Sequence, residues 1–264
     1  MRRAEIIANL ETRYFSDEMD EAAELSTFPQ QLTNVRVFFD IGAAIGQYTK
    51  VANEHLRNAT IVAFEADPIR FEHLEENCRR WERLSTNTIR AVHAAVCDKD
   101  GAIAFQAHED SVRSGGLFIP GMPDVQADTD RNSWLTLSIQ GMSLDTYCKA
   151  NQLTPDLVKM DIEGAEYRAL LGAQSILQMQ QCRFLIEVHP WGDIPKDKKP
   201  ADVFNLLAQY GYDFTRLERH WSFAKAKHRS LALLKNRGMR FVFGHPLLLR
   251  TLKRVMVRYI LSKR

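Results

Sequence analysis

Short apolar runs alternate with segments of helical periodicity along most of the chain. The runs at 37–41 and 61–65 are rich in β-branched and aromatic residues, and the mixed pattern at 47–57 between them suits a helix. Three further apolar runs follow segments of helical spacing, at 89–96, 157–161 and 184–189. This alternation predicts an α/β fold with a doubly wound, mostly parallel, Rossmann-like sheet flanked by helices.

Local signals define the remaining elements. Asp67 and Pro68 form an N-cap followed by proline at the first helical position, which opens a helix through Trp81, and Ser143 caps another helix. Additional elements are predicted as helices at 165–180 and 201–209, strands at 102–107 and 135–140, and a closing strand pair at 213–217 and 231–235.

The chain length, 264 residues, fits one large α/β domain with additions. We expect this domain at 34–240, after a helical lead-in at 1–33. Within it, the segment 108–134 is rich in Ser, Gly, Pro and Asp. Loops longer than about 12–15 residues inside compact domains are usually functional or disordered, so we expect a lid over the substrate there.

Charge and targeting signals narrow the class of protein. The 35 basic and 33 acidic residues give a formal net charge of +2, which offers no global reason to expect nucleic acid as a partner. The first residues lack the apolar stretch of a signal peptide, and no apolar run reaches the roughly 18 residues of a membrane span, so we expect a cytoplasmic protein. The four cysteines are widely spaced, which favours reduced core thiols over disulfides or metal ligands.

A glycine-punctuated turn follows the first predicted strand, with Gly42 and Gly46 before the next helix. Such a turn lets a ligand approach the backbone and the free N–H groups of a helix, although it is also an ordinary strand-to-helix connection. Glu65 ends the second strand 23 residues after Gly42, about where related folds place an acid on ribose hydroxyls. The ligand predicted from this spacing carries a ribose.

The turn favours an adenosyl ligand that bears an amino acid. Ala44 occupies the second glycine position of the dinucleotide fingerprint, where glycine admits a pyrophosphate. Asp40 would repel phosphate but suits the ammonium group of a methionine, directly or through water. S-adenosylmethionine satisfies both observations, and a dinucleotide oxidoreductase is the disfavoured alternative.

Two later strands also end on polar residues, at Asp161 and at His189. Ligands of open parallel sheets bind outside the carboxyl ends of the strands, so Asp40, Glu65, Asp161 and His189 should converge on one rim.

Five motifs carry a resemblance to a known family. They are DIGAAIGQY at 40–48, AFEADP at 63–68, SLD at 143–145, LVKMDIEGAE at 157–166 and LGA at 171–173. Together they resemble the FkbM family of S-adenosylmethionine-dependent methyltransferases over about residues 37–190. The chain departs from the family in two places. It has Ala44 where asparagine is usual in the first turn, and Ala-Asp-Pro at 66–68 where a pair of prolines is usual after the ribose acid.

The resemblance implies roles for the rim. Asp40, Gly42 and Gly46 would hold the methionine end of the cofactor and Glu65 its ribose. Ala95 and Asp98, after the third strand, would lie near the adenine. The family is associated with O-methylation of sugars and natural-product hydroxyls, so the expected acceptor is a small-molecule or glycan hydroxyl.

An alcohol is a poor nucleophile, so a base of near-neutral pKa would help transfer. His189 is the candidate by its strand-end position, against the alternative of a histidine that only hydrogen-bonds a loop. Asp161 and Glu163 would position the acceptor or lie near the sulfonium, with helix capping by acids as the alternative for both, chiefly for Glu163. Lys159 shares a strand face with Asp161 and is its expected ion partner.

Two further expectations concern ligands beyond the cofactor. Asp161, Glu187 and His189 could together hold Mg²⁺, although we assign no metal ligand from sequence alone. The segment 241–264 is predicted as a basic amphipathic helix, and 246–264 would lie on an anionic membrane surface or, equally, dock on the domain or a partner. The alternative function for the whole chain is an inactive, methyltransferase-like scaffold.

Overall fold

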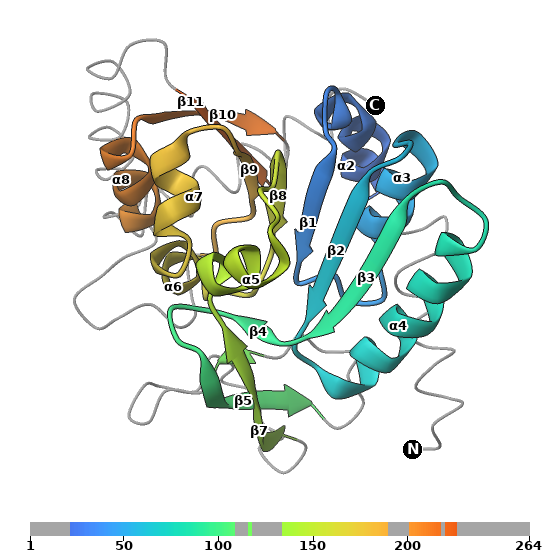
Figure 1. Cartoon of the computed structure of the whole chain (residues 1–264). Coiled ribbons are helices and arrows are strands. Elements are labelled where there is room, and N and C mark those ends of the chain that lie inside the picture. Colours follow the sequence, from blue (N-terminus) through green and yellow to red (C-terminus); the bar gives the residue numbers. More distant parts are fainter. Residues whose placement is uncertain (1–21, 109–115, 118–133, 190–200, 218–219, 226–264) are drawn as a thin grey trace, which may run out of the picture.

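Five parallel strands form the centre of the main sheet in a computed structural model of the chain (Figure 1). The structure describes residues 22–108, 116–117, 134–189, 201–217 and 220–225. Across the sheet the strands follow the order β10 (Tyr212–Leu217), β11 (His220–Lys225), β9 (Arg183–Ile186), β8 (Leu157–Met160), β1 (Val37–Ile41), β2 (Thr60–Glu65) and β3 (Thr88–His93). The pairs from β9 to β3 are parallel, and β10 and β11 add an antiparallel edge. The predicted doubly wound, mostly parallel α/β sheet is confirmed.

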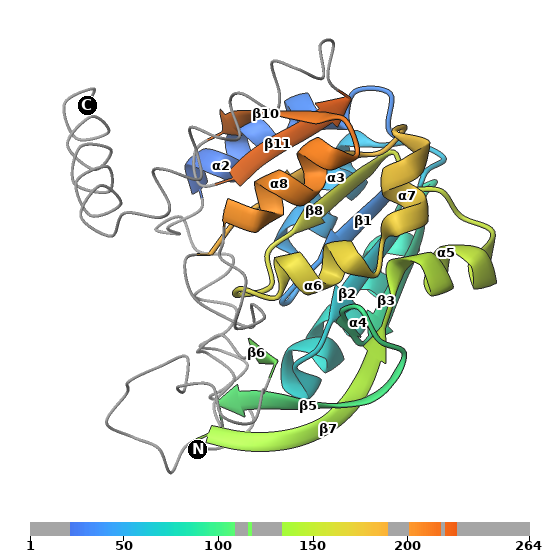
Figure 2. The same ribbon diagram turned by 90° about the vertical axis from the view of Figure 1, so that its left-hand side faces the viewer.

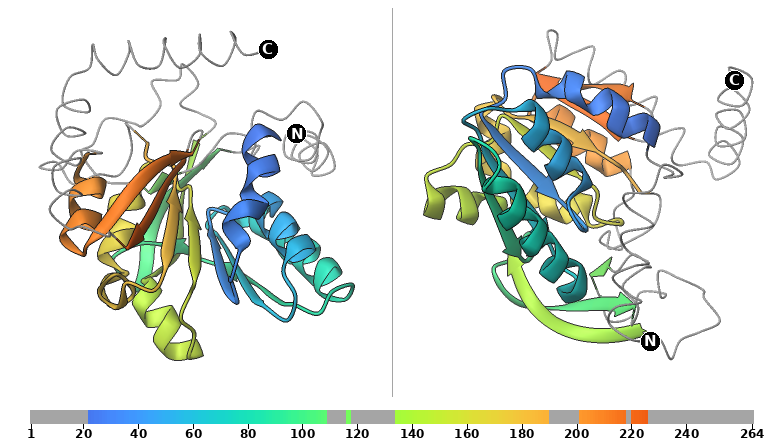
Figure 3. Two further views of the ribbon diagram at one scale, coloured as in Figure 1. Left: turned by 90° about the horizontal axis from the view of Figure 1, so that it is seen from above. Right: turned by 90° about the vertical axis from the view of Figure 1, so that its right-hand side faces the viewer.

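Helices cover both faces of this sheet (Figure 3). One face carries α2 (Ala22–Thr27), the 3₁₀ helix η1 (Phe28–Leu32), α3 (Gln47–His55) and α4 (Pro68–Glu82). The other carries α5 (Leu144–Asn151), α6 (Glu166–Leu171), α7 (Gln174–Met179) and α8 (Ala201–Gln209). Successive residues of a strand point to opposite faces. Accordingly, Phe38 packs in the apolar core under η1, α3 and α4, and Phe39 packs in the core under α5, α6, α7 and α8. Asp40 therefore points into the same layer as Phe38.

The predicted helix caps are present. The Asp67 carboxylate accepts hydrogen bonds from the backbone N–H groups of Ile69 (2.9 Å) and Arg70 (3.0 Å), and Ser143 Oγ accepts one from Thr146 (3.2 Å). Both caps satisfy N–H groups that have no partner inside their helices.

A second, smaller sheet lies beside the carboxyl ends of the main strands (Figure 2). Its strands follow the order β4 (Ala95–Val96), β7 (Trp134–Met142), β5 (Gly101–His108) and β6 (Gly116–Leu117). The single strand predicted at 89–96 was therefore wrong. The chain turns at Ala94, whose N–H donates to the carbonyl of Glu65 (3.1 Å), so β3 stays in the main sheet and β4 joins the second one.

The single helix predicted at 165–180 was also wrong, because it breaks between α6 and α7. A Cβ on Gly172 would lie 2.2 Å from the carbonyl oxygen of Cys97, so only glycine allows this approach. The Gly172 carbonyl accepts from the N–H of Asp145 (2.9 Å), and the Asp145 carboxylate accepts from the N–H of Ser175 in the first turn of α7 (2.8 Å). Tertiary contacts thus replace the continuous helical ladder.

The remaining differences lie at the edges of the domain. The partner of β10 is β11 rather than the predicted strand at 231–235, which lies outside the described residues. So do most of the expected lid at 108–134, residues 1–21 of the lead-in and the predicted helix at 241–264; of the lid interior, Gly116 and Leu117 are described, as β6. Among the described helices, none is both long and apolar enough to cross a membrane.

Candidate active site

The turn after β1 winds through alternating left-handed residues. Gly42, Ala44 and Gly46 have φ values of +74°, +51° and +100°. A Cβ on Gly42 would lie 1.8 Å from the backbone oxygen of Asp161, and one on Gly46 would lie 2.9 Å from the Trp81 ring. Both glycines are therefore required by the packing of the chain itself, whether or not a ligand also uses the turn.

Asp40 lies beneath this turn rather than at its surface. Its side chain has no exposed area, and it accepts a hydrogen bond from Thr49 Oγ1 at 2.7 Å. Burial raises the pKa of Asp40, and the nearby Lys159 ammonium opposes that rise. In this structure the carboxylate supports the turn from below.

Lys159 connects the turn with the end of β8. Its Nζ lies 3.7 Å from Asp40 Oδ1 and 3.8 Å from Asp161 Oδ2, and it donates to the carbonyl of Gly42 at 3.1 Å. The expected pairing with Asp161 is confirmed. The contacts with Asp40 and Gly42 were missed, because they depend on strand order rather than on spacing along the sequence.

Glu65 links the end of β2 to the same turn. One carboxylate oxygen accepts from the N–H groups of Ala66 (2.9 Å) and Asp67 (2.8 Å), and the other accepts from the N–H of Ala44 (2.8 Å). Burial raises the pKa of Glu65, against the opposing charge of Arg70. The acid predicted for the ribose is thus fixed in place by backbone groups before any ligand binds.

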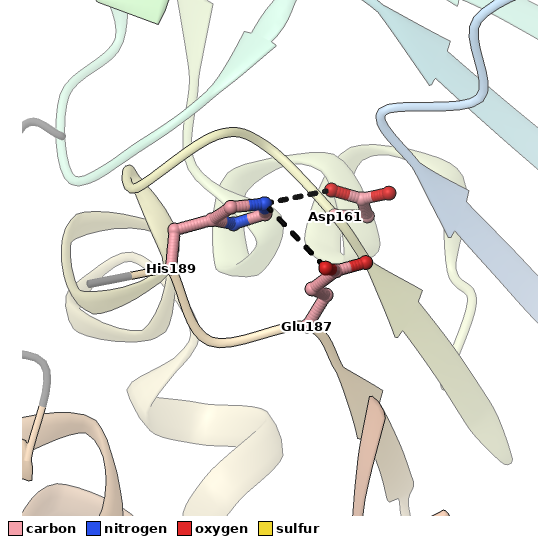
Figure 4. Close-up of side chains that lie close together, drawn as sticks. All are labelled: Asp161, Glu187 and His189. Carbon is pink, nitrogen blue, oxygen red and sulfur yellow. Dashed lines mark ion pairs between the residues drawn. The ribbon is translucent and has the colours of Figure 1, made fainter. Parts of the chain in front are cut away.

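The ends of β8 and β9 bring a second group of side chains together (Figure 4). His189 Nε2 lies 3.7 Å from Asp161 Oδ1, 3.6 Å from Glu163 Oε2 and 3.9 Å from Glu187 Oε1. On the other side of the ring, Nδ1 lies 2.8 Å from Glu166 Oε1. Four carboxylates therefore surround one buried imidazole.

This setting changes the expected role of His189. Burial works to lower its pKa, but the Glu166 hydrogen bond and the charges of Glu166, Asp161 and Glu163 outweigh it, and the pKa rises to about 10. In the protein without ligands His189 is therefore an imidazolium at neutral pH, which does not accept a proton. The expectation of a near-neutral base needs this correction, because a base there requires another cation to offset the carboxylates.

Glu166, rather than Glu163, begins the helix that follows β8. The capping alternative for Glu163 is wrong, since α6 starts only at Glu166 and Glu163 occupies a left-handed turn with φ +53°. Glu166 is 1% exposed and also accepts from the N–H of Gly164 at 3.0 Å. Sequence reasoning missed Glu166, because a glutamate in a first helical turn ordinarily faces solvent.

The two residues expected near the adenine differ in their surroundings. Ala95 is buried in an apolar cluster with Phe105, Ala107 and Ile139, and Ala66, next to Glu65, packs against that cluster. Asp98 instead accepts from Arg168 of α6 at 2.8 Å. Ala95 thus lies on the Glu65 side of the rim, while Asp98 is engaged by an arginine.

Comparisons with known proteins identify the family of the chain. The methyltransferase FkbM domain matches residues 40–214, about two thirds of the chain. The hexuronic acid methyltransferase AglP of Haloferax volcanii is 24% identical over 197 residues, which cover 74% of this chain and 71% of that protein.

Solved structures give weaker likenesses. The FkbM methyltransferase of Methylobacillus flagellatus KT is 17% identical with a TM-score of 0.48, and the match covers 81% of this chain but only 47% of that one. A methyltransferase-like protein of Silicibacter pomeroyi DSS-3 is 13% identical with a TM-score of 0.44, over 83% of this chain and 95% of that one. On the extent of the domain match, the chain belongs to the FkbM family of S-adenosylmethionine-dependent methyltransferases.

Proposed function

We propose that the protein transfers a methyl group from S-adenosylmethionine to a hydroxyl of a sugar, a glycan or a glycosylated natural product. The observation that carries the proposal is the direct contact between the glycine turn and the end of β8, where Gly42 meets Asp161 and Lys159 bridges the two. A cofactor on the turn and an acceptor beside Asp161 would then be neighbours. The hexuronic acid methyltransferase relative supports a sugar acceptor.

The cofactor would lie along the ends of β1, β2 and β4. In this proposal Gly42 and Gly46 shape the turn under the methionine end, with Asp40 behind them. Glu65 would accept hydrogen bonds from the ribose hydroxyls, since each carboxylate oxygen can accept more than one. Ala95 and its apolar neighbours offer a surface for the adenine, with Asp98 at its margin.

Transfer is a substitution at the methyl carbon. The acceptor oxygen forms a bond to the methyl group, the bond from sulfur to that carbon breaks, and neutral S-adenosylhomocysteine leaves. The acceptor proton would go to a carboxylate at the ends of β8 and β9, for which Asp161 and Glu163 are the candidates. Their charge would also favour the sulfonium before transfer, and in-line placement of the two reactants supplies much of the acceleration.

The cofactor assignment is tested by calorimetric titration with S-adenosylhomocysteine, with NAD as the control ligand. We expect saturable binding of the adenosyl compound alone. Glu65→Ala should weaken this binding, whereas His189→Ala should leave it unchanged and slow methyl transfer to sugar acceptors. Glu76→Ala, an exposed change on α4, is the matched control.

Two outcomes would contradict the proposal. Binding of NAD without the adenosyl compound would favour an oxidoreductase. Absence of binding by either ligand to a folded protein would favour a scaffold without turnover.

A further inference from the structure

The ends of β8 and β9 hold two carboxylates side by side. The ladder continues one residue past each strand, with the N–H of Asp161 donating to the carbonyl of Ile41 (3.0 Å) and that of Glu187 donating to the carbonyl of Met160 (3.0 Å). Both residues thus sit on backbone fixed by the sheet. His189, two residues after Glu187, completes a group whose ligand atoms all lie within 4.8 Å of one another.

The spacing of these atoms suits donors around one ion. Nε2 of His189 lies 3.7 Å from Asp161 and 3.9 Å from Glu187, which is beyond hydrogen-bond distance. Donor atoms around one ion, with bonds of about 2.0–2.2 Å, are separated by about 3.0–4.4 Å. Small side-chain rotations would therefore bring all three donors onto a single cation.

Glu166 orients the imidazole from behind. It accepts from Nδ1 of His189 at 2.8 Å and is itself held by the N–H of Gly164, at 1% exposure. Metal-bound histidines almost always donate their second N–H to a carboxylate or a carbonyl in this way, which fixes the tautomer and aims the other nitrogen. Here it aims Nε2 at Asp161 and Glu187, as Figure 4 shows.

We propose that Asp161, Glu187 and His189 bind one divalent first-row transition-metal ion next to the acceptor, a step that rests on the methyltransferase function proposed above. One imidazole nitrogen with two carboxylates favours such an ion over Mg²⁺, which prefers oxygen ligands alone. Two carboxylate charges balance the ion, and its binding to Nε2 would displace the proton of the His189 imidazolium to solvent. Three protein donors leave coordination positions open for acceptor oxygens, and a bound cation there would lower the pKa of the acceptor hydroxyl.

Metal binding is measured on the chelator-treated, desalted full chain without cofactor, by titrating Mn²⁺ and following the free-ion signal in electron paramagnetic resonance. We expect one saturable Mn²⁺ site. Zn²⁺ should displace Mn²⁺ from it, and Mg²⁺ should do so poorly. Glu187→Gln and His189→Gln should each weaken binding more than ~10-fold, and Glu166→Gln about 10–100-fold through the imidazole orientation. The exposed Glu76→Gln should bind like the unchanged protein.

Calorimetry with S-adenosylhomocysteine on the same samples separates this proposal from the previous one. Cofactor binding without a Mn²⁺ site in a folded protein would overturn the metal proposal alone. An Mn²⁺ affinity of Glu187→Gln and His189→Gln equal to that of the unchanged protein would overturn it too, as would displacement of Mn²⁺ by Mg²⁺ at equal concentration. Mn²⁺ binding without cofactor binding would support the metal site and count against the proposed function.

Discussion

Replacing Lys159 by Met should destabilise the protein by more than any surface charge change. The ammonium is 3% exposed and lies 3.7 Å from Asp40, whose side chain has no exposed area. Within the described residues, Asp40 Oδ1 accepts no hydrogen bond, so nothing else there compensates that oxygen once the ammonium is gone. Removing one partner of a buried ion pair costs about 3–5 kcal/mol, and methionine retains most of the apolar stem.

The loss of unfolding free energy in Lys159→Met should depend on pH, because Asp40 titrates. Burial raises the pKa of this carboxyl in the folded protein above its ordinary value of 3.8, so the folded state binds the proton more tightly than the unfolded state. Stability from this group is present in acid and lost as pH rises through the folded pKa. Lys159 lowers that pKa, so the variant should lose stability over a window extending to higher pH, and the two proteins should converge on acidification.

The assay is urea unfolding followed by tryptophan fluorescence, with free energies from midpoints at matched slopes. Lys50→Met is the matched control, because its ion pair with Glu54 spans 3.9 Å at 45% exposure and should contribute under about 1 kcal/mol. Asp40→Asn combined with Lys159→Met should recover much of the loss. A loss for Lys159→Met equal to that of Lys50→Met, or a double variant no more stable than the single one, would refute the reasoning.

Three shorter predictions concern the same rim. In the metal-free protein the pKa of His189 is raised from 6.5 to about 10, so its contribution to stability should be fully present below pH 6.5 and be lost as the pH rises through about 10. Melting temperatures of the protein and of His189→Gln, measured across this range, should therefore converge in alkali. Gly42→Ala should abolish cofactor binding and lower the melting temperature far more than Gly101→Ala, because both have positive φ but only Gly42 meets backbone atoms, those of Asp161. Ala44→Gly should raise the unfolding free energy by up to about 1.5 kcal/mol, because a left-handed alanine is strained by about 1–2 kcal/mol and glycine loses about 0.5–1 kcal/mol in entropy. A urea midpoint below that of the parent would contradict this.

Elements with their own local signals could be predicted from the sequence. The strand before Gly42, the strand before Glu65 and the helix capped by Asp67 each combine an apolar period with a start or stop residue. The break at Ala94 has no such signal, because 89–96 is apolar on both sides of the turn. The break at Gly172 depends on a carbonyl of Cys97, which only the folded chain brings near.

The candidate site could likewise be predicted only in part from the sequence. The topology of parallel sheets predicted that Asp40, Glu65, Asp161 and His189 converge on one rim. In the structure His189 lies 3.7 Å from Asp161, and Lys159 lies between Asp161 and Asp40. The protonation state of His189 could not be predicted, since it depends on Glu166, which a helix start places behind the ring. Lys159 was assigned one carboxylate where strand pairing gives it two.

Asp161 connects the two halves of the rim through its separate oxygens. Oδ2 lies 3.8 Å from Lys159, which reaches back to Asp40 and to the carbonyl of Gly42 under the turn, and Oδ1 lies 3.7 Å from His189. A cation drawn toward Oδ1 would pull electron density away from Lys159, and a shift of the turn would reach Oδ1 through the same carboxylate. The two subsites are also joined by hydrogen bonds, because the N–H of Asp161 donates to the carbonyl of Ile41 (3.0 Å) and Lys159 Nζ donates to the carbonyl of Gly42 (3.1 Å). If the cofactor lies on the turn and the acceptor beside Asp161, as proposed, these hydrogen bonds would fix the distance between the methyl group and the acceptor, which is the condition that in-line transfer requires.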